Sequence, residues 1–265
     1  MDTICASFLG NGAITALYYS NRLMQLPLAI FGLAMATVSL PMMSKSVATK
    51  NIEELKETLN FSIRISIIAL LPATVGLMAI GLPIIQILFE RGKFDTFASL
   101  LTNKALFYYV LGLPAFAITK IFANTFFSFQ DTKTPVKIAF VVMFVHVILC
   151  VVLMKPLGVG GLALATSACA YMNVFMLFYK LKQRIGKIGA RRILISSIKA
   201  LIASTLMGII AYEIMQIKVL PMIVALLISI ICSIISFIIF LKILKSQEMD
   251  QILLGINKKK NAKNS

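Results

Sequence analysis

Seven long apolar segments follow one another along this chain, and they limit its possible folds more than any other feature. The segments cover about residues 13–43, 65–89, 98–129, 136–154, 157–179, 193–215 and 219–244. A helix needs about 20 apolar residues to cross a bilayer, and each segment is close to or above that length. Apolar residues make up 59% of the chain and charged residues 14%, whereas a soluble domain is about half apolar and about a quarter charged. We therefore predict an all-α, polytopic membrane helix bundle with seven full transmembrane helices.

The ten residues MDTICASFLG precede these segments. They are too short to span a membrane and lack the basic start of a signal peptide. We interpret them as the outer end of a helix that begins further upstream. The chain then divides into a truncated helix end at 1–10, a bundle of five full spans at 11–185, two further spans at 186–246, and a basic tail at 247–265.

Most of the 26 lysines and arginines stand in every second loop. These loops cover residues 44–64, 119–137 and 180–199, and the tail after residue 241 belongs with them. Short basic loops stay on the cytoplasmic side, so this pattern predicts a cytoplasmic C-terminus. Membrane topology and contact with anionic lipids account for the net charge of +16, which therefore indicates no nucleic-acid partner.

Several local motifs predict where helices begin or pack. Asn51, with an acid three residues later and an apolar stripe after it, predicts a short helix on the membrane surface. Thr134 before a proline predicts the N-cap of the fourth full span, and Asp95 or Thr96 predicts that of the third. The small residues of 158–170 predict close packing against a neighbouring helix.

Arg22 is the only charged residue between Ala13 and Met43. It lies roughly 13 Å below the outer end of that span, since a helix rises about 1.5 Å per residue. A charge at that depth costs about 2.5 kcal/mol or more unless it faces a polar cavity or a partner. Thr15 and Tyr18 share its helical face. This stripe indicates a wet chamber for an anionic ligand; the alternative is an arginine that reaches the outer headgroups beside interfacial tyrosines.

The chain offers little for catalysis. Its four cysteines are isolated within apolar runs and are typical of small buried residues. One histidine and ten scattered acids form no metal motif, nucleophile motif or phosphate-binding loop. An enzyme acting on polyprenyl phosphates would need clustered aspartates for Mg²⁺, which this sequence lacks. We therefore expect a transporter without a resident cofactor.

Three sequence motifs indicate a particular protein family. They are ALYYSNRLMQLPLAIFGLAMATVSLP at 16–41, LFERGKFDTFAS at 88–99 and FFSFQDTKTPVKIA at 126–139. In order and spacing they closely resemble the MurJ/MviN family of lipid II flippases, within the multidrug/oligosaccharidyl-lipid/polysaccharide flippase superfamily. The similarity runs along the whole chain and is weakest after about residue 185. It implies fourteen helices in two halves around a central cavity, and this chain is similar to the C-terminal half.

The resemblance implies alternating-access transport of lipid II, a peptidoglycan precursor, across the bacterial inner membrane. It implies that Arg22 meets the substrate pyrophosphate, with Thr15 and Tyr18 beside it as substrate contacts. A guanidinium is always charged and forks onto phosphate oxygens, so the chemistry agrees. The implied partners are lipid II, membrane lipids and the N-terminal half of the transporter.

The resemblance also implies a coupling site. Asp2 matches an acid of the seventh helix that serves a coupling cation in some family members, and Thr166 matches a threonine ligand of the twelfth. The eleventh helix departs from the pattern with His146 and Cys150, which are poor ligands for a hard cation. We therefore expect weak or absent sodium dependence, with a proton at Asp2 or His146, or the membrane potential, as the substitute. The alternative for His146 is a hydrogen-bonded packing residue.

Two other functions stay open at this point. The chain is a non-transporting fragment if the half cannot work alone, because half a transporter lacks a closed cavity. A cation-coupled multidrug exporter of the related fold is the other alternative. Such an exporter favours acids in its cavity, so the basic Arg22 argues against it.

Overall fold

The computed structural model describes residues 2–10, 12–216 and 221–244, and every regular element in them is a helix. Lys218 and the basic tail at 247–265 lie outside the described residues. In chain order the helices are α1 (Asp2–Ala6), α2 (Ala13–Pro27), the π-helix η1 (Leu28–Leu33), α3 (Ala34–Ala48), α4 (Ile52–Phe89), α5 (Thr96–Leu111), α6 (Leu113–Ser128), α7 (Lys133–Leu157), α8 (Val159–Ile185), α9 (Ala190–Met215) and α10 (Met222–Ile243).

The prediction of seven full spans is confirmed. Six helices are long and apolar enough to cross a membrane, when α2, η1 and α3 are counted as one continuous helix. The pair α5 and α6, counted as one span, is the seventh; it bends by 43° at its break instead of running as one helix over 98–129. Pro114 lies in the first turn of α6. Because proline has no N–H and its ring excludes the carbonyl four residues earlier, the helix is interrupted there.

The first span continues through Pro27 because the chain widens into the π-helix η1 directly after it. Proline cannot continue regular α-helical hydrogen bonding, and a π turn absorbs the mismatch before α3 resumes. Gly32 within η1 lies against α6, where an added Cβ would be 3.1 Å from the Cβ of Ala117. This close approach fixes η1 on α6.

The prediction of a short helix on the membrane surface after Asn51 is wrong. Asn51 is the N-cap, as predicted, and its side chain accepts the backbone N–H of Glu54 at 3.1 Å. The helix that begins there runs on as α4 into the following span and is kinked at Ile80. Leu55 and Leu59 are fully buried in a cluster with residues of α3, α6 and α8. The apolar stripe therefore faces the protein core and not the lipid headgroups.

Of the other predicted caps, one is right and one is wrong. Asp95 caps α5 by accepting the N–H of Ala98 at 2.8 Å. Thr134 does not cap α7; it donates its N–H at 3.0 Å and its hydroxyl at 2.8 Å to the carboxylate of Asp131. Arg184 of α8 donates to the same carboxylate at 2.9 Å. These groups, the backbone N–H of Thr134 first, hold the pKa of Asp131 below its usual range.

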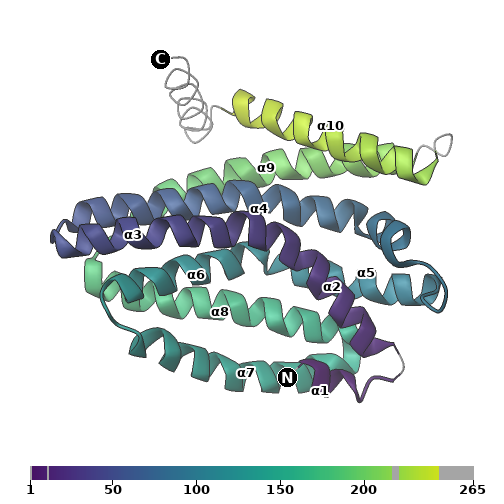
Figure 1. Ribbon diagram of the computed structural model, residues 1–265, viewed down its shortest axis with the longest axis horizontal. Coiled ribbons are helices and arrows are strands. Elements are labelled where there is room, and N and C mark those ends of the chain that lie inside the picture. Colours follow the sequence, from purple (N-terminus) through teal and green to yellow (C-terminus); the bar gives the residue numbers. More distant parts are fainter. Residues whose placement is uncertain (1, 11, 217–220, 245–265) are drawn as a thin grey trace.

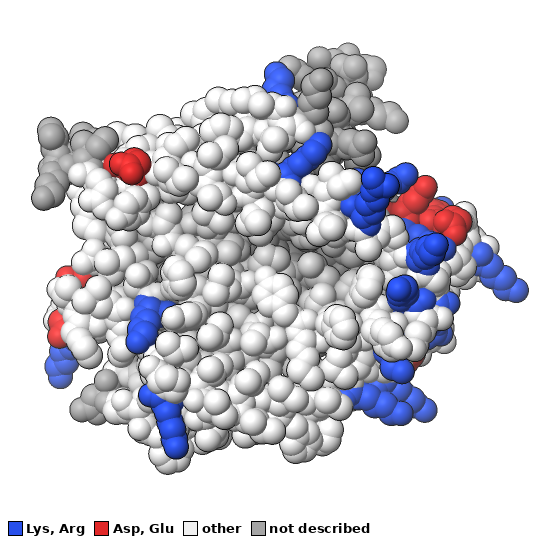
Figure 2. All heavy atoms as spheres, turned by 180° about the vertical axis from the view of Figure 1, so that it is seen from behind, with Lys and Arg blue, Asp and Glu red and all other residues white. Residues whose placement is uncertain are grey.

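The axes of the spans are roughly parallel, and the chain direction reverses from one span to the next (Figure 1). α10, α9 and α4 are packed in succession on one side, and α7 packs on α8 at the other. The α3–α4, α6–α7 and α8–α9 connections lie at one end of the molecule (Figure 1). Lysine and arginine side chains gather at one end of the face drawn in Figure 2. The gathering of basic side chains at one end agrees with the sequence pattern, in which every second loop is rich in lysine and arginine. The division at residue 186 stays a prediction.

Candidate functional site

Close packing between α7 and α8 prepares the site. A Cβ on Gly161, in the first turn of α8, would overlap the backbone carbonyl of Leu153 in α7. Only glycine therefore lets these two helices approach as they do. The prediction that 158–170 packs closely against a neighbour is confirmed, since most of this segment is buried.

Three helices bring the predicted coupling residues together. Oδ1 of Asp2, from α1, lies 3.2 Å from Nε2 of His146 on α7. Oδ2 of the same carboxylate accepts the hydroxyl of Thr166, from α8, at 2.9 Å. His146 Nε2 lies 3.2 Å from the Thr166 hydroxyl. Residues far apart in the sequence thus form one cluster, which we call the Asp2 junction.

Cys150 and Tyr109 complete the Asp2 junction. Cys150 stands one turn after His146 on α7, with its Sγ 3.4 Å from His146 Nε2 and 3.8 Å from Asp2 Oδ1. The Tyr109 hydroxyl, from α5, donates to Asp2 Oδ2 at 3.0 Å. Cys150 is fully buried and Tyr109 is 2% exposed, whereas the side chains of His146 and Asp2 are 15% and 24% exposed. The junction is therefore largely buried, and its exposed part belongs to His146 and Asp2.

Tyr109 is a site residue that the sequence did not indicate. It stands in YYVLGLP, where an apolar run with two tyrosines is typical of core packing or of a membrane interface. Its partner Asp2 lies more than a hundred residues away, so no spacing rule connects the two. The break between α5 and α6 is the one local sign that this span is irregular.

The predicted substrate residues lie together on a different surface. Thr15, Tyr18 and Arg22 are all exposed on one face of α2. The Arg22 guanidinium donates to the Tyr18 hydroxyl at 3.0 Å and its carbon lies 5.1 Å from the Tyr18 ring centre. Among the described residues no carboxylate forms an ion pair with Arg22. The guanidinium is therefore held along its own helix with donors to spare.

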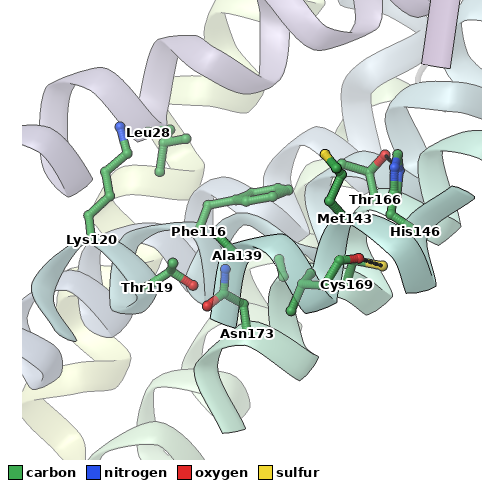
Figure 3. Close-up of a pocket in the computed structure, with 12 residues that line it drawn as sticks. Leu28, Phe116, Thr119, Lys120, Ala139, Met143, His146, Thr166, Cys169 and Asn173 are labelled. Atoms are coloured by element: carbon green, nitrogen blue, oxygen red, sulfur yellow. Dashed lines mark hydrogen bonds between the residues drawn. The ribbon is translucent and has the colours of Figure 1, made fainter. Parts of the chain in front are cut away.

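A pocket of about 420 Å³ opens beside the Asp2 junction (Figure 3). Its walls come from α6, α7, α8 and η1. His146 and Thr166 lie at one end, and Lys120, Thr119 and Asn173 lie toward the other (Figure 3). His146 and Thr166 therefore belong both to the Asp2 junction and to the pocket wall.

Lys120 is a second residue whose position the sequence analysis missed, because it was assigned to a basic loop. It is the only charged residue between Lys104 and Asp131. An isolated charge in an apolar segment is the signal that singled out Arg22, and it applies here too. The hydroxyl of Thr119 is buried without a hydrogen-bond partner beside it.

These features define a class before they define a family. The described residues hold membrane-length helices, one polar helix face whose guanidinium has no acidic partner, and an interior cluster of hydrogen-bonding groups beside a pocket. Such a combination is typical of polytopic membrane transporters, in which intramembrane ionisable groups mark substrate and ion paths.

The chain belongs to the lipid II flippase MurJ family, whose model matches residues 1–233. It is 37% identical over 177 residues to a probable lipid II flippase MurJ of Vibrio cholerae, covering 67% of this chain and 34% of that protein. A probable lipid II flippase MurJ of Rickettsia prowazekii is also 37% identical, over 206 residues, which cover 77% of this chain and 40% of that protein.

A solved structure agrees with this assignment. A lipid II flippase MurJ in an inward closed conformation matches with a TM-score of 0.78 and 29% sequence identity. The match covers 91% of this chain and 49% of that one. The chain thus has the family's fold and is a multi-pass inner-membrane protein, and it spans half or less of the relatives it matches.

Proposed function

We propose that this chain forms the C-terminal half of a lipid II flippase and moves lipid II across the inner membrane by alternating access. Membership of the MurJ family carries this proposal. The pattern of buried and exposed charges supports it, because one cation faces outward on α2 with no acidic partner among the described residues. The chain is a transporter component and not an enzyme.

Arg22 binds the pyrophosphate of the substrate. Its guanidinium is exposed and uses one hydrogen bond, to Tyr18, so further N–H groups are available for phosphate oxygens. Tyr18 orients the guanidinium, and Thr15 offers a hydroxyl two turns away on the same face. A cationic drug would be repelled from this face, which disfavours the multidrug-exporter alternative.

The chain works only with an N-terminal half. The polar face of α2 needs a second wall to become a chamber, because an exposed arginine beside lipid is costly. Inverted or paired repeats in transporters place their binding sites between the two halves. The partner is therefore an N-terminal half of the same transporter family.

Complementation tests this proposal. The chain is expressed alone, or together with the N-terminal half of a related flippase, in cells depleted of their own flippase. We expect no growth with the chain alone and growth with both halves. Normal growth with the chain alone would overturn the need for a second half, and failure of the pair would favour a non-transporting fragment.

The C-terminus lies in the cytoplasm. The basic α3–α4, α6–α7 and α8–α9 connections lie at one end of the molecule, and α10 ends with Lys242 at its last turn. A cysteine introduced as Lys259→Cys is expected to resist membrane-impermeant thiol reagents added from the periplasm. Labelling of this site in intact cells would show that the C-terminus lies in the periplasm instead.

Transport does not depend on sodium. Sodium prefers oxygen ligands, whereas His146 and Cys150 supply nitrogen and sulfur next to Asp2. Replacing sodium by choline in the growth or transport assay is expected to leave activity unchanged. A sodium-dependent rate that disappears in Asp2→Ala would contradict this proposal.

A further inference from the structure

We propose that Asp2, His146 and Cys150 bind a borderline-soft divalent transition cation of the Zn²⁺ class at the Asp2 junction. No metal motif is visible in the sequence, because Asp2 lies far along the chain from His146 and Cys150. The fold places one oxygen, one nitrogen and one sulfur donor within 4.8 Å of one another. This inference does not depend on the transported substrate.

The donor separations suit a small tetrahedral ion. The three pairs of donor atoms lie 3.2, 3.4 and 3.8 Å apart. Bonds of about 2.0 Å to nitrogen and oxygen and about 2.3 Å to sulfur place tetrahedral donors roughly 3.3–3.6 Å apart. A cation can therefore enter between the three donors with only small side-chain shifts.

His146 and Cys150 form a preorganised pair. Residues four apart on a helix lie on the same face, which is the spacing that the paired histidines of helical zinc sites use. α7 is continuous through both residues. A thiol and an imidazole together favour Zn²⁺ and related ions over Na⁺, Mg²⁺ or Ca²⁺, which require several oxygen ligands.

The other groups of the junction orient the Asp2 carboxylate. Thr166 and Tyr109 both donate to Oδ2, at 2.9 and 3.0 Å, so Oδ1 is the oxygen that faces His146 and Cys150. Hydrogen bonds of this kind to a ligating carboxylate are a regular part of metal sites and hold the ligand in place.

The pocket supplies the route to the site. His146 and Thr166 line the cavity of about 420 Å³ as well as the junction, so an ion and its water can reach the donors from that side. Three protein ligands leave a fourth tetrahedral position for water or for the Thr166 hydroxyl. Binding replaces the Cys150 S–H bond by a sulfur–metal bond and releases that proton to water.

Occupancy of this site fastens α1 to α7. Asp2 is the only ligand outside α7, and α1 is five residues long. A metal bond therefore adds a strong link between α1 and a helix that is distant in sequence. Because a ligand that binds only the folded state stabilises it, the bound cation raises the unfolding temperature.

Cobalt(II) titration of the purified chain in detergent tests the site, because Co²⁺ replaces Zn²⁺ and absorbs light. We expect one equivalent to bind with a thiolate-to-cobalt charge-transfer band and the visible bands of tetrahedral cobalt, and Zn²⁺ to displace it. Excess Na⁺ or Mg²⁺ should not. Folded wild-type chain that binds no cobalt, or binds it without the thiolate band, overturns the proposal and leaves a hydrogen-bonded cluster only.

The variants identify the ligands. Cys150→Ser should abolish the charge-transfer band, and His146→Gln and Asp2→Asn should each weaken binding at least tenfold. Cys169→Ser, on the pocket wall, and Cys232→Ser, on α10, are matched thiol controls and should bind as wild type does. Zn²⁺ should raise the unfolding temperature of the wild type and of both controls, and not that of Cys150→Ser. A band that persists in Cys150→Ser would exclude the site as proposed.

Discussion

Arg22 and Asp2 are both charged residues of a membrane protein, yet their surroundings differ in kind. Asp2 is partly buried and has partners on α5, α7 and α8. Arg22 is exposed, and its hydrogen-bond partner, Tyr18, is one turn away on its own helix. The chain thus satisfies the first charge by itself and leaves the second for something outside it. Changes at the Asp2 junction should therefore affect folding, and changes at Arg22 should affect function.

The largest effect is expected from Arg22→Ala in a complete transporter. Loss of the guanidinium removes the phosphate contact, so cells depleted of their own flippase should fail to grow. Arg22→Lys should restore growth in part, because lysine keeps the charge and loses the bidentate geometry. The folding stability of both variants should stay within about 0.5 kcal/mol of wild type, as is usual for exposed sites.

Arg91→Ala is the control for this prediction. Arg91 is exposed in the α4–α5 connection, so its loss removes a cation of the same type from a site outside the proposed chamber. Growth with Arg91→Ala should be normal. If Arg22→Ala also grows normally, Arg22 has no role in transport and its contrast with Asp2 disappears.

A large effect on folding is expected from Gly161→Ala. The added Cβ would overlap the Leu153 carbonyl, so α7 and α8 must separate. Overpacking of this kind costs about 1–3 kcal/mol, and more when backbone must move. Gly76→Ala in α4 is the control, since its Cβ would meet only Met207 Cε at an ordinary 3.7 Å. We expect Gly161→Ala to lower the unfolding temperature and Gly76→Ala to leave it unchanged. Equal stability of the two variants would refute the tight contact between α7 and α8.

A direct comparison of the two regions uses the same substitution twice. Thr166→Val removes a hydroxyl that donates to the Asp2 carboxylate and should cost about 1–3 kcal/mol of unfolding free energy. Thr15→Val removes an exposed hydroxyl on α2 and should change the unfolding free energy by less than about 0.5 kcal/mol. Denaturation of both purified variants in one detergent measures the difference. An equal response would mean that the junction is no better ordered than the exposed face.

The sequence predicted the parts of this fold that depend on local pattern. Apolar length located the spans, and the side-chain caps at Asn51 and Asp95 were read correctly because a cap bonds to a backbone group three residues away. The role of Asp131 was missed for a tertiary reason. Its carboxylate is held by Arg184, from another helix, as well as by Thr134, and a single motif cannot reveal the distant partner.

The wrong and missing predictions concern which neighbours a helix face contacts in the folded protein. The stripe of Leu55 and Leu59 was recognised, yet lipid and a protein core present the same apolar environment to a sequence pattern. Tyr109 and Lys120 were missed because their functional neighbours come from other helices. Asp2, His146 and Thr166 were named through a family resemblance, and only the fold showed that Cys150 and Tyr109 meet the same carboxylate.

A smaller effect than that of Thr166→Val is expected at Asp131, a carboxylate in the α6–α7 connection. Asp131→Asn weakens the bonds to Thr134 and Arg184. It should cost about 0.5–1 kcal/mol at neutral pH, because the Arg184 side chain is 40% exposed and solvent screens its charge. The native pKa of Asp131 is lowered, so its charge stabilises the fold above the usual aspartate pKa, and this contribution is lost as the pH falls through the native pKa. The stability difference between wild type and Asp131→Asn should therefore shrink on acidification. A difference that stays constant with pH would show that the Asp131 charge contributes nothing to stability.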